Sequence, residues 1–82
     1  MNEKIFNIFN GLVPKKTLDI ILNDFESVAE INILELGVDS LAIMEVVFRI
    51  EECIGHEFDY DNFSIEQIQT LRLILNIINS KK

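Results

Sequence analysis

Residues 35–55 read ELGVDSLAIMEVVFRIEECIG and contain signals for the start and the end of one helix. Asp39 or Ser40 can cap the first turn, because short polar side chains accept hydrogen bonds from the free N–H groups there. Gly55 follows the last apolar residue, and glycine readily adopts the left-handed conformation that ends a helix. The stretch therefore predicts a helix that runs from Asp39 or Ser40 to about Ile54.

The apolar residues of this helix form two separate stripes when each residue turns the chain by about 100°. The first stripe has the spacing of an ordinary core face and consists of Ile43, Val46, Val47, Ile50 and Ile54. The second stripe lies about 100–160° further round the axis. We call it the apolar ridge, and it consists of Leu41, Met44 and Phe48. One helix needs only one buried stripe, so the ridge is either buried in a small bundle or exposed for a partner.

Acidic residues surround the ridge. Glu45 and Glu52 lie beside it, and Glu51 lies on its other flank. Between residues 17 and 66 the chain has thirteen acidic residues and one basic residue, Arg49. A surface that served only solubility would mix the two signs with less self-repulsion. We therefore interpret the ridge and its carboxylates as a docking face for a basic partner, with a merely solvated surface as the alternative.

The N-terminal half predicts further helices and no strand, because glycine and proline are sparse and strict alternation is missing. A first helix is expected from about Asn2 to residue 10 or 12, where Pro14 stops or kinks it. Thr17 is expected to cap a short second helix. Residues 26–36 have isolated apolar positions and are expected to form a loop laid over the core.

Capping patterns predict two helices in the last third of the chain. Ser64 and Gln67 have the spacing of a capping box, which places a short helix around residues 62–67. Thr70 is expected to cap a last helix over residues 71–79. Lys81 and Lys82 follow that helix, where cations suit its dipole. The expected fold class is all-α, a small four-helix bundle with three longer helices and a short third one.

Length and composition exclude several classes of protein. The 82 residues are expected to form a single domain over residues 1–82. A net charge of −7 argues against a nucleic-acid binder, which needs a basic face. One cysteine and one histidine exclude an intramolecular disulfide and a cysteine-cluster zinc site, and no metal is expected. No apolar run approaches the roughly 18 residues of a membrane span, so we expect a monomeric, cytoplasmic protein.

Catalytic machinery is not expected. The only histidine, His56, lies at the far end of the predicted helix from Ser40, too far to activate its hydroxyl. Cys53 fits a packing thiol at the core edge better than a nucleophile. Asp59 and Asp61 alternate as in a calcium loop, but the glycine and the terminal glutamate of such a loop are missing. If Ser40 acts, it acts as an exposed hydroxyl at a helix N-terminus, a place that favours an attached phosphate.

Residues 35–41, followed by Glu45 and the pair at 51–52, look like a carrier-protein signature. The chain resembles the acyl carrier and peptidyl carrier proteins over residues 33–78. The resemblance implies that Ser40 receives a 4′-phosphopantetheine arm from coenzyme A, and that a magnesium-dependent phosphopantetheinyl transferase reads Asp39. The thiol of the arm holds acyl or aminoacyl groups as thioesters in that family. The resemblance further implies that partner enzymes recognise Leu41, Met44, Glu45, Phe48, Glu51 and Glu52.

The implied partners are the transferase, a loading ligase or adenylation enzyme, and downstream synthase enzymes; the protein itself is expected not to be an enzyme. Ala42 and Arg49 depart from the fatty-acid carriers, which indicates a specialised polyketide, nonribosomal-peptide or related pathway. The Gly-Val-Asp-Ser-Leu form favours acyl cargo, with aminoacyl cargo as the close rival. Two other classes stay open: a non-covalent docking module in which Ser40 is only a helix cap, and, least favoured, a small Ser40-dependent hydrolase.

Overall fold

Residues 2–80 are described by a computed structural model, in which every regular element is helical apart from one isolated β-bridge. The elements in chain order are α1 (Asn2–Phe9), α2 (Lys15–Asn23), α3 (Phe25–Val28), α4 (Ala42–Ile54), the 3₁₀ helix η1 (Ile65–Ile68) and α5 (Leu71–Ser80). The predicted all-α class is therefore confirmed. Lys81 and Lys82, expected beyond the last helix, lie outside the described residues.

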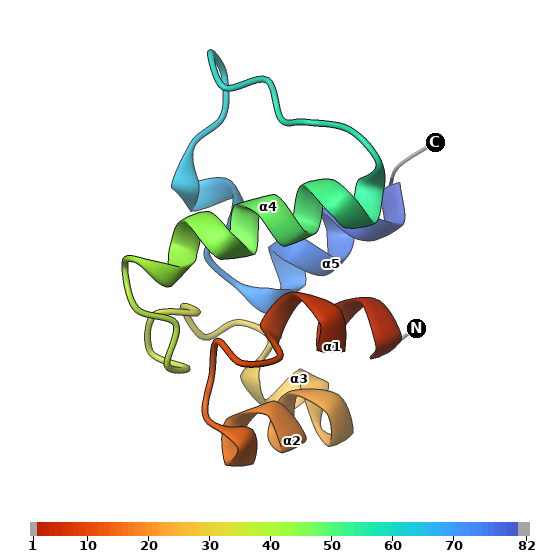
Figure 1. Ribbon diagram of the computed structural model, residues 1–82. Helices are drawn as coiled ribbons and strands as arrows, with labels where there is room; N and C mark the ends of the chain where they lie inside the picture. Colours follow the sequence, from red (N-terminus) through yellow and green to blue (C-terminus); the bar gives the residue numbers. More distant parts are fainter. Residues whose placement is uncertain (1, 81–82) are drawn as a thin grey trace.

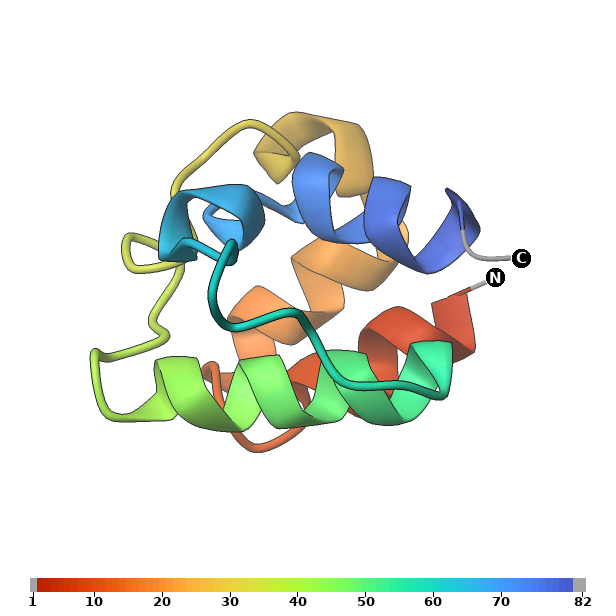
Figure 2. The same cartoon turned by 90° about the horizontal axis from the view of Figure 1, so that it is seen from above.

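The helices pack as a small bundle around α1, α4 and α5. α4 contacts both α1 and α5, and α1 lies between α4 and the pair formed by α2 and α3 (Figure 1). Seen from above, residues 55–64 run back along the bundle from the end of α4 to η1, which packs against α5 (Figure 2). Residues 35–41 lie at one end of the bundle, and the start of α1 and the end of α5 lie at the other.

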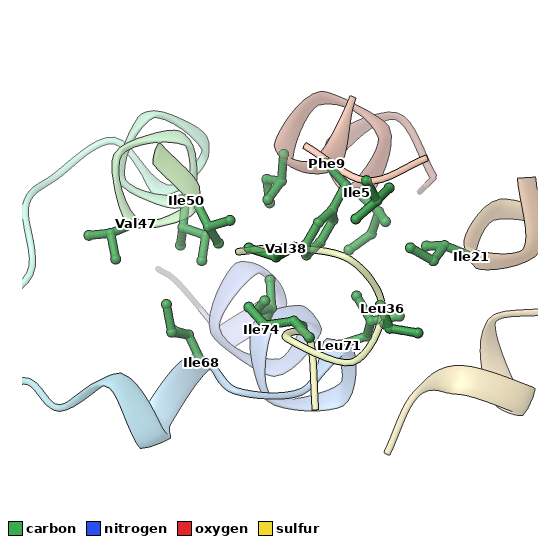
Figure 3. Packing of buried hydrophobic residues seen from close by; sticks show 14 of the residues in the cluster. Ile5, Phe9, Ile21, Leu36, Val38, Val47, Ile50, Ile68, Leu71 and Ile74 are labelled. Carbon is green, nitrogen blue, oxygen red and sulfur yellow. The ribbon is translucent and has the colours of Figure 1, made fainter. Parts of the chain in front are cut away.

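One apolar core joins these elements. Phe9 of α1, Ile50 of α4 and Ile74 of α5 are completely buried and meet in its centre (Figure 3). Leu36 and Val38 reach the same core from the loop ahead of α4. Among the described residues no polar or charged side chain is buried. Each fully buried aliphatic or aromatic side chain stabilises the fold by about 1.5–3 kcal/mol relative to exposure.

The N-terminal third differs from the prediction in its helix boundaries. α1 ends at Phe9, slightly before the predicted end at residue 10 or 12, and Pro14 occupies the N-cap position of α2, whose first residue is Lys15. Thr17 therefore lies within the first turn of α2, and its predicted role as a cap is wrong. The physical reason is that proline suits the position just before a helix, where no N–H is needed. The loop predicted over residues 26–36 also begins inside a helix, the single turn α3.

Both capping predictions in the last third are confirmed. The Ser64 hydroxyl accepts the N–H of Glu66 at 3.2 Å, and the Gln67 side chain accepts the N–H of Ser64 at 3.3 Å. The capped element is one 3₁₀ turn that starts slightly later than expected. The Thr70 hydroxyl accepts the N–H of Leu73 at 3.2 Å and so caps α5.

A cluster around Arg72 ties α5 to α3. The guanidinium donates two hydrogen bonds to the Glu26 carboxylate and one, at 3.0 Å, to Glu30. It also lies 5.8 Å from the centre of the Phe25 ring. The hydrogen bonds from Arg72 hold the pKa of Glu26 below its usual range. Two of the thirteen acids counted in the sequence are thus matched by a base from outside that span.

Candidate functional site

The loop ahead of α4 is fastened to the start of α5. The N–H of Ile33 donates to the carbonyl of Gln69 at 2.8 Å. An antiparallel bridge pairs the neighbouring residues Asn32 and Thr70. This loop carries residues 35–41, so α5 fixes the place at which this segment reaches the surface.

Gly37 is required by the close packing of this loop. Its φ is +115°, and a Cβ there would lie 2.8 Å from the Cδ of Pro14. Only glycine meets both demands, because other residues have a side chain and avoid positive φ. Leu36 and Val38 on either side are buried, which leaves residues 39–41 at the surface.

Asp39 caps α4, and Ser40 is left free. The Oδ1 atom of Asp39 accepts the N–H of Ala42 at 2.8 Å. The Ser40 side chain is exposed, and its hydroxyl makes no hydrogen bond to the part of the chain that the structure describes. The sequence left either residue open as the cap. α4 begins at Ala42, slightly later than predicted, with Leu41 directly before it, and Asp39 is the one of the two whose side chain bonds the first N–H of the helix. A free hydroxyl therefore lies just before the positive end of a 13-residue helix.

Among the described residues, no side chain that could act as a general base is hydrogen-bonded to this hydroxyl. His56 follows the far end of α4, about 20 Å along the helix axis, and its Nδ1 lies 3.0 Å from the carbonyl oxygen of Glu57. Cys53 is half-buried, and burial raises the pKa of its thiol, which lowers the fraction of reactive thiolate. The Ser40 hydroxyl thus has none of the side-chain activation that a nucleophilic serine needs.

The Asp59 carboxylate has a local structural role. The Asp59 carboxylate accepts the N–H of Asp61 at 3.2 Å and the side-chain amide of Asn62 at 2.7 Å. These hydrogen bonds stabilise a turn. Within residues 2–80, no three His, Cys, Asp or Glu side chains come together in a way that could hold a metal ion.

The two stripes of α4 differ in exposure as the favoured interpretation requires. All five residues of the first stripe are buried. On the apolar ridge, the exposed fractions are 90% for Leu41, 48% for Met44 and 50% for Phe48. The alternative in which both stripes are buried is therefore wrong. An apolar strip of this kind, next to a free serine, is a surface that a partner protein can cover.

Arg49 has a role that the sequence analysis missed. Its guanidinium binds the Glu45 carboxylate at 2.9 Å and also donates to three backbone carbonyls at the end of α1. These carbonyls belong to Asn7, Ile8 and Asn10, at 3.3, 3.1 and 2.7 Å. The last carbonyls of any helix lack intrahelical partners, and α1 has no basic residue in its last turn. The lack of a basic residue in the last turn of α1 was the sequence signal that a base from elsewhere in the chain could bond these carbonyls.

The three acids beside the ridge differ in their hydrogen-bond and ion-pair partners. Glu45 is paired with Arg49, and Glu51 accepts hydrogen bonds from the backbone of Phe58 and from the Tyr60 hydroxyl. Glu52 is exposed and forms no ion pair with another described residue. The structure therefore places all three acids near the ridge, and of the three only Glu45 is paired with a described cation.

A cavity of about 270 Å³ opens beside Ser40. Its walls come from the loop ahead of α4, from α4 itself and from the η1 region, and include Ile33, Ile43, Ile65 and Gln69. Sequence analysis did not find it, because these residues lie in separate segments that only the fold brings together. The lining is mainly apolar and adjoins the free hydroxyl.

Comparison with known proteins gives one match. The family model described as "phosphopantetheine attachment site" matches residues 15–78, a range that includes every candidate residue above and starts after α1. No curated protein and no solved structure matches the chain. Of the helices described, none has both the length and the apolar character to cross a membrane.

Proposed function

Because the chain belongs to the phosphopantetheine-attachment family, we propose that it is a carrier protein in which Ser40 is the attachment residue. The observation that carries this assignment is the state of the Ser40 side chain. It is exposed, its hydroxyl is free, and it lies inside the matched range at the start of α4. The three other serines of the chain, Ser27, Ser64 and Ser80, lie outside residues 35–41.

The residues around Ser40 fit a 4′-phosphopantetheine group. Asp39 uses its carboxylate oxygen Oδ1 to cap α4, so the hydroxyl is not needed for that purpose. A phosphodiester on Oγ would carry a negative charge, which the positive end of α4 favours. The apolar cavity beside Ser40 offers space for part of the arm or for a short cargo chain. The terminal thiol of the group supplies the thioester chemistry, while this chain only presents and shelters it.

The apolar ridge is the proposed docking face for enzymes that act on the arm. Leu41, Met44 and Phe48 provide adaptable apolar contact. Glu45, Glu51 and Glu52 surround it with negative charge, which speeds encounter with a basic surface. Brief but specific docking suits a protein that must visit several enzymes in turn, among them the transferase, a loading enzyme and downstream synthase enzymes.

We further propose that the chain does not itself catalyse a reaction and that it serves a specialised biosynthetic pathway. The tethered cargo gains a high effective concentration at each enzyme that the carrier visits. The Gly-Val-Asp-Ser-Leu sequence and the apolar cavity both favour acyl cargo over aminoacyl cargo. Incubation of the loaded carrier with lysate and ATP, followed by mass spectrometry of the thioester, separates the two.

Intact mass spectrometry tests the assignment of Ser40. The chain is incubated with coenzyme A, magnesium and a broad-specificity phosphopantetheinyl transferase, next to Ser40→Ala and Ser27→Ala variants. We expect wild type and Ser27→Ala to gain one phosphopantetheine group and Ser40→Ala to gain none. Ser27 is a matched control because it is exposed and its hydroxyl bonds only to a backbone carbonyl of its own segment.

Lack of any gain on folded wild type, while a known carrier is modified in parallel, would contradict the proposal. The exposed ridge would then favour the other class considered from the sequence, a non-covalent docking module. Modification of Ser40→Ala would show instead that another residue carries the group.

A further inference from the structure

Glu51 fastens the loop that follows α4. Its Oε2 atom accepts the N–H of Phe58 at 2.9 Å, and the same atom accepts the hydroxyl of Tyr60. Phe58 and Tyr60 lie in the segment of residues 55–64 that returns from the end of α4 to η1 (Figure 2). One oxygen of one side chain thus fixes this segment to the helix at two points.

Tyr60 is held at both of its ends and is still half-exposed. Its hydroxyl binds Glu51, and its ring meets the Phe63 ring edge-on, with the centroids 6.1 Å apart. Phe63 in turn stacks on Phe58 at 4.6 Å, and both phenylalanines pack against the core. The exposed fraction of Tyr60 is nevertheless 50%. A large aromatic side chain is therefore kept in one place at the surface.

This fixed ring lies at the C-terminal end of the apolar ridge. Glu51 follows Phe48 by three residues, so the two side chains lie on the same side of α4. Because Tyr60 contacts Glu51, it continues the series of exposed apolar side chains that begins at Leu41. Glu52, next in the chain, is exposed and forms no ion pair with another described residue.

We propose that Tyr60, positioned by Glu51, is part of the docking face for the phosphopantetheinyl transferase, and that the exposed Glu52 carboxylate pairs with a basic group of that partner. The inference rests on the proposed carrier function and deepens it. The matching partner surface is basic opposite Glu52 and has an apolar pocket for the Tyr60 ring. The strong excess of acid on residues 17–66 gives the charge complementarity that this partner requires.

The Tyr60 ring is already ordered before a partner binds. An aromatic side chain that is already fixed loses little conformational freedom when a partner covers it. Rings with a polar end are frequent anchors at protein interfaces for this reason. Glu51 is a positioning residue in this scheme: its Oε2 atom accepts two hydrogen bonds from the loop, and its main effect on the partner is to hold Tyr60 in place.

Steady-state loading by the transferase tests the proposal, with kcat and KM measured for each variant. The key comparison is Glu51→Gln against Glu51→Ala. Since a single oxygen of Glu51 accepts both hydrogen bonds, the amide oxygen of glutamine can accept both as well, without the charge. Glu51→Gln therefore removes charge and keeps position, whereas Glu51→Ala removes both.

We expect Tyr60→Ala and Glu51→Ala each to raise KM about tenfold with little change in kcat. Glu51→Gln should stay within about twofold of wild type, and Glu52→Gln should raise KM by about threefold and weaken its dependence on salt. Ile20→Ala is the matched control, because Ile20 is an exposed apolar residue on α2, away from α4. It should leave both constants unchanged.

The absorbance of Tyr60 reports its position independently. It is the only tyrosine, and the chain has no tryptophan. The hydrogen bond to Glu51 raises the pKa of Tyr60 to about 12. In Glu51→Ala, an ultraviolet titration should show that pKa returning toward the ordinary value of about 10. Should Glu51→Ala fail to fold, Tyr60→Phe takes its place, since it loses the hydroxyl, keeps the ring and should raise KM less than Tyr60→Ala.

Two results would contradict this inference and leave the proposed carrier function unaffected. One is a KM for Glu51→Gln raised as much as that of Glu52→Gln, which would show that Glu51 pairs with the transferase directly. The other is a Tyr60→Ala variant that loads like Ile20→Ala. Failure of folded wild type to be modified at all would overturn the proposed function, and this inference with it.

Discussion

The first stripe and the apolar ridge lie on two faces of α4, with Leu41 of the ridge directly before its first residue, and the two faces differ in exposure and in neighbouring charge. The first stripe is buried against α1 and α5, and its side chains form the centre of the core. The apolar ridge points to solvent, with Leu41 almost fully exposed. Apolar character alone therefore does not distinguish a core face from a docking face. Our proposal that the ridge is a docking face rests on the carboxylates next to it and on the free serine at its start.

Substitutions on the two faces are also expected to have different effects. Substitution on the buried stripe should lower the free energy of unfolding, because it leaves a cavity in a close-packed core. Substitution on the ridge should leave stability nearly unchanged and slow the reactions of partner enzymes.

The largest effect is expected at Ile50, which is completely buried. Ile50→Ala should lower the free energy of unfolding by about 2–5 kcal/mol, a large share of the total for a domain of this size. Urea denaturation followed by circular dichroism measures it. A loss below about 1 kcal/mol would be typical of a surface site and would contradict the assignment of this face to the core.

Phe48→Ala tests the opposite face of the same helix. We expect stability to change by no more than about 0.5 kcal/mol. The kcat/KM for loading Ser40 should fall about tenfold, since a half-exposed aromatic on the docking face is lost. Parallel urea curves and loading assays give both values. A variant that is destabilised like Ile50→Ala would show that the ridge belongs to the core.

Arg49→Met probes the residue that connects the docking face to α1. Removal of the guanidinium leaves three carbonyls at the end of α1 without their donor, so stability should fall by about 1–2 kcal/mol. It also frees the Glu45 carboxylate, so loading should depend more steeply on salt. Glu45→Gln is the control, because it breaks the ion pair and leaves the carbonyls bonded. Equal stability of the two variants would contradict the role assigned to Arg49 in holding α1.

The smallest effect on stability is expected from Tyr60, in the loop that follows α4. The raised pKa of Tyr60, about 12, means that the folded state favours the neutral phenol. The unfolded chain ionises near pH 10, so this contribution is complete below pH 10 and is lost as the pH rises toward 12. Urea midpoints of wild type should therefore fall more than those of Tyr60→Phe between pH 8 and pH 11. Identical pH profiles would show that the hydrogen bond to Glu51 does not stabilise the fold.

Features governed by local sequence could be predicted. The helix over α4, its end at Gly55, the capping box at Ser64 and the cap at Thr70 all follow from residues within a few positions of one another. The same holds for the two stripes, because helical periodicity fixes which side chains share a face. The position of Ser40 at the start of α4 follows in the same way.

Features made by tertiary contacts could not be predicted. Arg49 was interpreted as a cation within the acidic face, yet it reaches the end of α1, about forty positions earlier in the chain. Glu51 was expected to be free for partners, and its hydrogen bond to Tyr60 is visible only once the loop is folded back. Thr17 has the side chain of a typical cap, yet the helix already starts at Lys15, directly after Pro14, whose fixed φ suits the beginning of a helix.

The bridge between Asn32 and Thr70 bears on the order in which the chain folds. It joins residues almost half the chain apart, and the loop that presents Ser40 depends on it. Contacts of such sequence separation form late, because a long segment must first be closed. During synthesis, the serine loop acquires its final position only after the start of α5 has left the ribosome. We therefore expect the proposed modification of Ser40 to be efficient on a chain that includes α5 and poor on a fragment that ends at α4.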